Sequence, residues 1–324
     1  MQGFSKTGTT GLPEVLVLEI LSKLPVKSLT RFRCVCKPWS CSFQAPLFIT
    51  KHQHNNLNLL FKGFHGNTRD GIHYFYQLST EKGQNFSVKH KFHFPFFEKG
   101  WSGLAVDGLC NGILCLHGAD KVALWNPSTR EFKILPQSSV QRPPSLHFTS
   151  LDGLGFGYDS QTNDYKVVRF VTNYFEEDSD AGLWFDPIHQ VELYSLTSDS
   201  WKEMSVHEVC ADGSPLFNNY VNGFYYWRAY WVPDTLILSF DMVNEKFSTL
   251  PLPQFDWGED FYKELLDFNG LLAAIFYPRE GTEKSFDLWE TMQITAYVES
   301  LVPINGRSEY EEHIIRRPAG AASN

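Results

Sequence analysis

The chain has 324 residues, of which 43% are hydrophobic and 15% aromatic, and its net charge is −9. This length has room for two domains, and 27 Phe, 14 Tyr and 9 Trp against only 4 Met favour β structure over a helical bundle. No run of about eighteen apolar residues is present, so no membrane association through a spanning helix is expected. Residues 1–11 lack the apolar core of a signal peptide and are expected to be disordered. The six cysteines are then expected to be free thiols in the cytoplasm, with the nucleus as a second compartment.

Residues 12–51 have the pattern of three short helices. Pro13 suits the first position of a helix, and apolar residues then recur at the spacing of one helical face as far as Leu24. Pro25 ends this helix, because it lacks a backbone donor and disfavours helical geometry in the residue before it. Two further helices are expected at about Lys27–Cys34 and from Pro38 onward, the last including Trp39 and Phe43.

Two Leu-Pro pairs twelve residues apart, followed by Lys27-Ser28-Leu29 and Val35-Cys36-Lys37-Pro38-Trp39, make this pattern more specific. In these residues the segment resembles an F-box, the module that binds Skp1 in SCF (Skp1–cullin–F-box) ubiquitin ligases. The resemblance implies a Skp1-like adaptor, and through it a cullin, as partners. The alternative is an amphipathic cap that packs on its own chain, although three short helices make a poor isolated core. The residues expected on the Skp1-facing surface are Leu12, Pro13, Ile20, Leu24, Pro25 and Leu29, whereas Val35 and Trp39 are expected to hold the helices together.

Charge is divided unevenly between this segment and the rest of the chain. Residues 12–51 hold six basic and two acidic residues, a net charge of +4, and the remaining residues hold 22 basic and 35 acidic ones, a net charge of −13. An acidic body argues against nucleic acid as its partner. Long-range attraction favours a basic protein target, and the alternative, that the acidity only keeps the body soluble, stays open.

After Thr50 the sequence changes to short β-rich runs that repeat. Each unit opens with Asn-Gly, a pair that supports a tight turn because both residues tolerate positive φ. Two apolar strands follow, and then Asn or Asp opens a second hairpin whose last strand carries an aromatic residue. Units of roughly forty to fifty residues have the size of a propeller blade, which buries its faces by stacking on neighbours. Three units start at Asn111-Gly112, Asn222-Gly223 and Asn269-Gly270, and a variant unit spans Leu154–Lys202.

The most specific stretches of the body are CNGILCL…LWNPSTREFKILP, LGFGYDSQTNDYKVVRF and VELYSLTSDSWKEM. Over roughly residues 100–290 they resemble the F-box-associated domain of plant F-box proteins, which is kelch-like, and together with the F-box they resemble the S-locus F-box and S-locus-F-box-like group. The implied fold class is α+β and multidomain: a helical F-box at 12–51, an all-β, propeller-like repeat domain at 52–304 and a disordered tail at 305–324. Because related chains usually continue with another complete unit after Trp289, the last blade is expected to be incomplete.

One cysteine pattern has the spacing of a metal site. Cys34-x-Cys36-x4-Cys41 is followed by His52-x-His54. The first two cysteines are expected inside a helix, however, where positions two apart point to different sides. Half-exposed or buried thiols are the preferred interpretation, and no metal is predicted.

No catalytic constellation stands out in the body. Cys110 and Cys115 flank an Asn-Gly turn, and thiols of core strands are preferred over a redox pair. Gly153-x-Gly155-x-Gly157 lacks the strand-then-helix context of a nucleotide loop and is expected to serve close strand packing and a turn. No catalytic residue and no cofactor are therefore predicted.

An acidic insertion is the best candidate for reading a target. Residues 176–186 interrupt an otherwise regular unit, and long loops are disproportionately functional; a merely solvated loop is the alternative. Tyr225-Tyr226-Trp227 and Tyr230-Trp231 are aromatic enough to anchor a partner, although strand alternation should place half of them in the core. The predicted target-binding residues are Glu176, Glu177, Asp178, Asp180, Trp184 and Phe185.

The function favoured by these patterns is that of a substrate-recognition subunit of an SCF E3 ubiquitin ligase, which is not itself an enzyme. The S-locus resemblance implies recognition of a pistil ribonuclease, typically a basic protein, in self-incompatibility. Two other functions stay open: a propeller-type binding protein or enzyme with a borrowed helical module, and a truncated paralogue without function.

Overall fold

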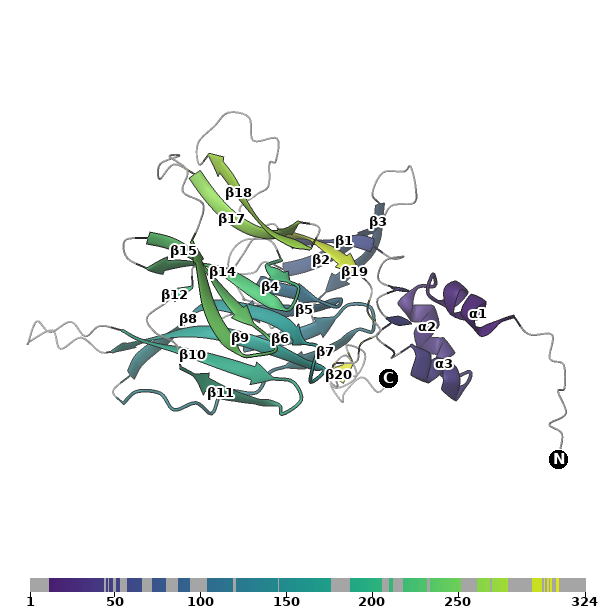
Figure 1. Cartoon of the computed structure of the whole chain (residues 1–324), viewed down its shortest axis with the longest axis horizontal. Helices are drawn as coiled ribbons and strands as arrows, with labels where there is room; N and C mark the ends of the chain where they lie inside the picture. Colours follow the sequence, from purple (N-terminus) through teal and green to yellow (C-terminus); the bar gives the residue numbers. More distant parts are fainter. Residues whose placement is uncertain are drawn as a thin grey trace, which may run out of the picture.

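The computed structural model shows a small helical module beside a larger β body (Figure 1). The structure describes residues 12–43, 45, 47–48, 51–52, 57–65, 72–79, 87–93, 104–118, 121–144, 146–175, 187–205, 210–211, 218–231, 234–251, 261–268, 270–278, 293–298, 300, 302, 304 and 307–308. None of the helices in these ranges has both the length and the apolar character needed to cross a bilayer.

The helical module has the three helices that the sequence predicts, but each ends earlier than expected: the first ends at Leu21 and not at Leu24 before Pro25. Its helices are α1 (Glu14–Leu21), α2 (Val26–Phe32) and α3 (Lys37–Ser42). Pro13 and Pro25 are the N-cap residues of α1 and α2, where a missing N–H costs little because this end of a helix has no internal partner for it. The core of the module consists of Leu21, Val26, Leu29, Phe43 and Phe48.

The prediction that Cys34 and Cys36 lie inside a helix is wrong. α2 ends at Phe32 with Arg33 as its C-cap, so both cysteines lie in the turn that leads to α3. Cys34 is exposed, as is Cys41, and Cys36 is half-buried. Across the described part of the chain, no three His, Cys, Asp or Glu side chains are grouped so that they could hold a metal ion.

In the described part of the body, twenty strands form five antiparallel sheets. In spatial order, the first sheet is β19 (Gln293–Val298), β1 (Leu57–His65), β2 (Ile72–Ser79) and β3 (Ser87–His93), and the second is β20 (Arg307–Ser308), β7 (Glu131–Ile134), β6 (Lys121–Asn126), β5 (Ile113–Gly118) and β4 (Ala105–Cys110). The third is β11 (Ser200–Met204), β10 (Ile188–Ser195), β9 (Asp164–Phe175) and β8 (Leu146–Asp159). The fourth is β12 (Cys210–Ala211), β14 (Phe224–Trp231), β15 (Asp234–Asp241) and β16 (Lys246–Pro251), with β13 (Tyr220–Val221) also on β14, and the fifth is β17 (Phe261–Phe268) and β18 (Leu271–Pro278).

Successive sheets meet through one strand each, here called the inner strand. β19 contacts β4, β4 contacts β8, β8 contacts β14, and β14 contacts β17. A succession of small antiparallel sheets that pack on their neighbours is the architecture of a propeller-like repeat domain. The predicted fold class, a helical module followed by such a β domain, is confirmed.

The C-terminal part of the chain completes the first two sheets. β19 pairs with β1, at the opposite end of the body's sequence, and becomes the inner strand of the first sheet (Figure 1). The chain then crosses the second sheet, where Asn126 Nδ2 donates hydrogen bonds to the carbonyl oxygens of Ser300 (3.2 Å) and Val302 (2.8 Å). Ile304 is fully buried, and β20 pairs with the outer edge of β7.

Two expectations for the C-terminus can be compared with this arrangement. The fifth sheet has two strands in the described residues, in line with an incomplete last blade. The predicted limit of the β body at residue 304 is too early, because Arg307 and Ser308 form β20 instead of part of a disordered tail. Residues 309–324 lie outside the described part of the chain.

Two of the three predicted Asn-Gly turns are present, and Asn269 of the third lies outside the described residues. Asn111-Gly112 joins β4 to β5 and Asn222-Gly223 joins β13 to β14. All four residues have positive φ, between 49° and 89°. This backbone geometry matches the twist of the two flanking strands, which is why Asn and Gly occur there.

The second kind of predicted turn opens with Asp or Asn. Asp159 Oδ1 accepts hydrogen bonds from the backbone N–H groups of Gln161 (2.9 Å) and Thr162 (3.2 Å). Asn126 and Asp241 accept from the second and third residues after them in the same way. A short polar side chain thus fixes each hairpin locally, and the repeat deduced from the sequence is a repeat of turns as well as of strands.

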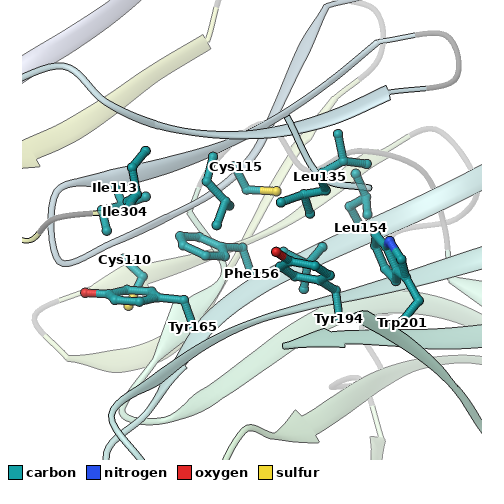
Figure 2. Packing of buried hydrophobic residues seen from close by; sticks show 13 residues of the cluster. Cys110, Ile113, Cys115, Leu135, Leu154, Phe156, Tyr165, Tyr194, Trp201 and Ile304 are labelled. Carbon is teal, nitrogen blue, oxygen red and sulfur yellow. The ribbon is translucent and has the colours of Figure 1, made fainter. Parts of the chain in front are cut away.

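The largest core cluster lies between the second and third sheets (Figure 2). Phe156 and Tyr165 of the third sheet pack with Cys110 and Cys115 of the second, and Ile304 adds a side chain from the C-terminal segment. Both thiols are free and buried, and burial raises the pKa of each well above its usual value. They are core thiols, as predicted, because an unreactive protonated sulfur is what such an apolar site favours.

The third and fourth sheets pack too closely for side chains at two positions. A Cβ at Gly155 would overlap the ring of Trp227, and one at Gly157 would lie 2.7 Å from Cδ2 of Tyr220. Gly155 and Gly157 therefore serve close packing of one sheet on another, as expected from the sequence, whereas the expected turn is wrong because all three glycines lie within β8.

Candidate docking surfaces

One side of α1 presents an apolar surface to solvent. Leu12 is 62% and Val15 75% exposed, and Leu16 and Ile20 are about half exposed. Positions four apart lie on one side of a helix, while the other side of α1 packs on the module's core through Leu21. We call Leu12, Val15, Leu16 and Ile20 the α1 apolar strip.

Most of the predicted adaptor-facing residues lie on or near this surface. Leu12, Pro13, Ile20 and Pro25 are exposed. Leu24 is half-buried against the module's core, and its carbonyl oxygen lies 2.9 Å from His52 Nε2, from which it accepts a hydrogen bond. Val15 and Leu16 were not predicted, although the sequence held a signal: α1 has more apolar residues than one core-facing stripe requires.

Two residues have the opposite of their predicted roles. Leu29 is fully buried, so it stabilises the packing of the helices and does not line the surface. Val35, predicted to hold the helices together, is 61% exposed in the turn after α2. Spacing alone does not say which side of a seven-residue helix faces its neighbours. Trp39 does have its predicted role, since its ring lies 5.9 Å from Phe32 and 6.5 Å from Phe43, centroid to centroid.

The aromatic run on β14 belongs mainly to the core. Tyr225 and Trp227 are buried, and Trp227 Nε1 donates to the carbonyl oxygen of Leu154 (2.8 Å). Tyr226 points the other way and is half-buried. The alternation predicted for these residues is confirmed, and the side chains of Tyr230 and Trp231 lie outside the described part of the chain.

The acidic insertion, Glu176 to Asp186, also lies outside the described residues. Its role in target binding stays a prediction for Glu176, Glu177, Asp178, Asp180, Trp184 and Phe185. The insertion follows β9, and β9 and its neighbour β8 carry an exposed aromatic pair at this end of the sheet. Phe148 on β8 is 51% exposed and Tyr174 on β9 is 36% exposed. Their rings stack at 4.5 Å with an interplanar angle of 14°.

The ionic groups buried in the body connect its sheets. Lys166 Nζ on β9 lies 2.8 Å from Asp159 Oδ2 and 2.9 Å from Glu245 Oε1 of the fourth sheet, and it donates to the carbonyl oxygen of Met242 (2.8 Å). Burial opposes ionisation of Asp159, but the hydrogen bonds that its carboxylate accepts from Lys166, from Thr162 and from the backbone N–H of Gln161 together outweigh burial and lower the pKa of Asp159 to about 2. These charges neutralise one another and connect the third sheet to the fourth.

A second buried group joins the first two sheets. The carboxylate of Asp107 on β4 pairs with His117 Nδ1 on β5, near Lys62 of β1. Burial lowers the pKa of Lys62 to about 8, against the attraction of Asp107. Burial also acts to lower the pKa of His117, but Asp107 reverses the effect and the pKa is raised. These two ionic groups lie inside the body, whereas the α1 apolar strip is exposed to solvent.

Comparison with known proteins agrees with the two-part architecture. The model of the F-box domain matches residues 10–50, and the model of the F-box associated beta propeller domain matches residues 60–292. F-box/kelch-repeat protein At3g23880 of Arabidopsis thaliana is 29% identical over 86% of this chain and 74% of its own length. F-box protein At3g07870 is 27% identical over 87% of this chain and 69% of its own length, and F-box protein CPR1 is 28% identical over 75% and 60%. The chain therefore spans between 60% and 74% of the length of these relatives.

Proposed function

The chain belongs to the family of proteins with an F-box-associated β-propeller domain, and from this premise we propose that it is a substrate-recognition subunit of an SCF ubiquitin ligase. The helical module binds a Skp1-like adaptor and through it a cullin, and the β body holds a target protein. The α1 apolar strip is the single observation that carries this assignment. Three apolar side chains exposed on one short helix, and a fourth from Leu12 just before it, gain favourable free energy when a partner covers them.

In this role the chain itself catalyses nothing. The assembled ligase brings the target's lysines close to the ubiquitin-loaded enzyme, so that a bimolecular transfer becomes effectively intramolecular. The chain contributes the geometry of that encounter. The helical module and the start of β10 lie on opposite sides of the β body, which leaves room for an adaptor and a target at the same time (Figure 1).

A charge placed in the α1 apolar strip tests the assignment. We expect Leu16→Asp/Ile20→Asp in the full chain to abolish co-purification with a co-expressed Skp1-like adaptor, because a carboxylate would be buried in an apolar interface. Val88→Asp, on the equally exposed β3, is the matched control and should leave co-purification unchanged. Retention of the adaptor by the double variant, with both proteins folded, would remove the strip from the interface and with it the proposed function.

The finer assignment is to the S-locus F-box group, in which the target is a pistil ribonuclease. The S-locus-like sequence stretches and the acidic body, net −13 outside the F-box, support it. Measured binding of the purified chain to pistil ribonucleases, compared with an acidic protein of similar size, tests it. Equal binding to both would leave only the broader assignment.

A further inference from the structure

The end of the third sheet next to the acidic insertion carries a cluster of polar and aromatic side chains on one face. Thr172 of β9 is opposite Ser150 of β8 and His189 of β10, and Tyr174 of β9 is opposite Phe148 of β8. Because side chains two apart on a strand share a face, the polar row and the stacked rings lie on the same surface. This surface is here called the β8–β10 platform.

The hydrogen bonds within the polar row of the β8–β10 platform leave acceptors at Asp152 and His189 for a ligand. Asp152 lies in a bulge of β8, and its carboxylate accepts from the hydroxyls of Ser150 (2.7 Å) and Thr172. Since the Thr172 hydroxyl has a single hydrogen, which it gives to Asp152, it accepts from His189 Nδ1 at 2.8 Å. In its neutral form, the exposed imidazole of His189 then carries its remaining lone pair on Nε2, and Asp152 lies on the same polar row.

The aromatic part of the β8–β10 platform also favours a ligand that is a cation and a hydrogen-bond donor. The faces of aromatic rings attract cations, and a guanidinium also stacks on them. Arg142 does not compete for the platform, because its partners Glu192 and Gln190 Oε1 (2.9 Å) lie on the other face of the sheet from His189. Residues 176–186, which join β9 to β10 in the sequence, include five acidic residues and no basic one, so the charge of this part of the sequence also favours a cationic ligand.

We propose that the β8–β10 platform, formed by Phe148, Tyr174, Asp152 and His189, docks an arginine-bearing segment of the target protein. The guanidinium stacks on the rings and donates hydrogen bonds to the Asp152 carboxylate and to His189 Nε2. Arginine fits better than lysine because it combines a flat face for stacking with several fixed donors. This inference rests on the proposed function only in taking the bound segment to belong to a degradation target.

A peptide in which three arginines alternate with glycine is the probe, and the same peptide with citrulline in place of arginine is its neutral match. We expect the full chain to bind the arginine peptide at low salt about tenfold more tightly than the citrulline peptide, as measured by fluorescence anisotropy. Phe148→Ala/Tyr174→Ala and, separately, Asp152→Asn should each weaken binding of the arginine peptide about tenfold. Phe268→Ala, which removes an aromatic ring that is 63% exposed on the fifth sheet, is the matched control and should change nothing.

The outcomes separate this site from a generally acidic surface. Equal binding by all variants, equal binding of the two peptides, or no binding at millimolar concentration would each overturn the proposal. Thermal unfolding of every variant establishes that it is folded, and Asp152→Asn preserves the shape of the side chain if the double truncation proves unstable. Co-purification of the same variants with the Skp1-like adaptor is measured in parallel, so that a failed platform is distinguished from a failed adaptor assignment.

Discussion

The helical module and the β body treat apolar and charged side chains in opposite ways. The module buries a core of only five residues and leaves the α1 apolar strip exposed. The body buries its aromatic residues between sheets and even takes charged groups inside, such as Lys166 with Asp159. We therefore expect the two regions to respond independently to mutation, because each has its own core and β19 of the body completes the body's first sheet.

The largest effect is expected where the sheets pack most closely. Trp227→Ala removes a buried ring that covers Gly155, and we expect it to lower the free energy of unfolding of the body by about 3–5 kcal/mol. Chemical denaturation followed by intrinsic fluorescence measures this loss. Capture of the Skp1-like adaptor at low temperature should persist, and a parallel loss of capture would contradict the independence of the two regions.

A somewhat smaller effect is expected from the buried ionic group. Lys166→Met leaves Asp159 without its cation and removes the donor to the Met242 carbonyl, and we expect a loss of about 3 kcal/mol. The same denaturation experiment measures it. The exposed Lys121→Met is the control, and an equal effect of the two substitutions would mean that the buried pairing contributes nothing specific.

The same pair gives the body a defined sensitivity to acid. The pKa of Asp159 falls from its ordinary 3.8 to about 2 in the folded protein. A depressed folded pKa stabilises the protein above the unfolded pKa, and this contribution is lost as pH falls from about 4 towards 2. We expect the unfolding free energy of the wild type to fall more steeply in this window than that of Lys166→Met. Parallel curves for the two proteins would contradict this assignment of the acid sensitivity.

The smallest effect is expected at an exposed turn. Asn222 has φ of 49° and its Nδ2 donates to the Gly270 carbonyl oxygen at 2.7 Å, which connects the fourth and fifth sheets. Asn222→Ala should cost about 1 kcal/mol through the lost hydrogen bond and the positive φ. Asn222→Gly keeps the backbone freedom and isolates the hydrogen bond. An unchanged melting temperature for both variants would show that this connection carries no stability.

The features that could be predicted from the sequence are local ones. Asn111-Gly112 predicts its turn because both residues tolerate the required φ, and Pro25 predicts the break between α1 and α2. The two Leu-Pro pairs predict the helical module because they resemble those of an F-box. What could not be predicted depends on residues far apart in sequence. Nothing in the pattern of β19 says that its partner is β1, and nothing around Leu29 or Val35 says which of them faces inward.

The pairing of β19 with β1 has a consequence for how the protein folds during its synthesis. During synthesis β1, β2 and β3 leave the ribosome early, but the inner strand of their sheet is the last long strand to be translated. Until then the first sheet exposes an unpaired edge, which is a site for wrong pairing with other chains. Contacts between such distant segments also slow folding, because the chain loses the entropy of closing a long loop before the contact contributes any favourable free energy. The newly made protein is therefore expected to be most exposed to aggregation, and most dependent on chaperones, before β19 emerges and pairs with β1.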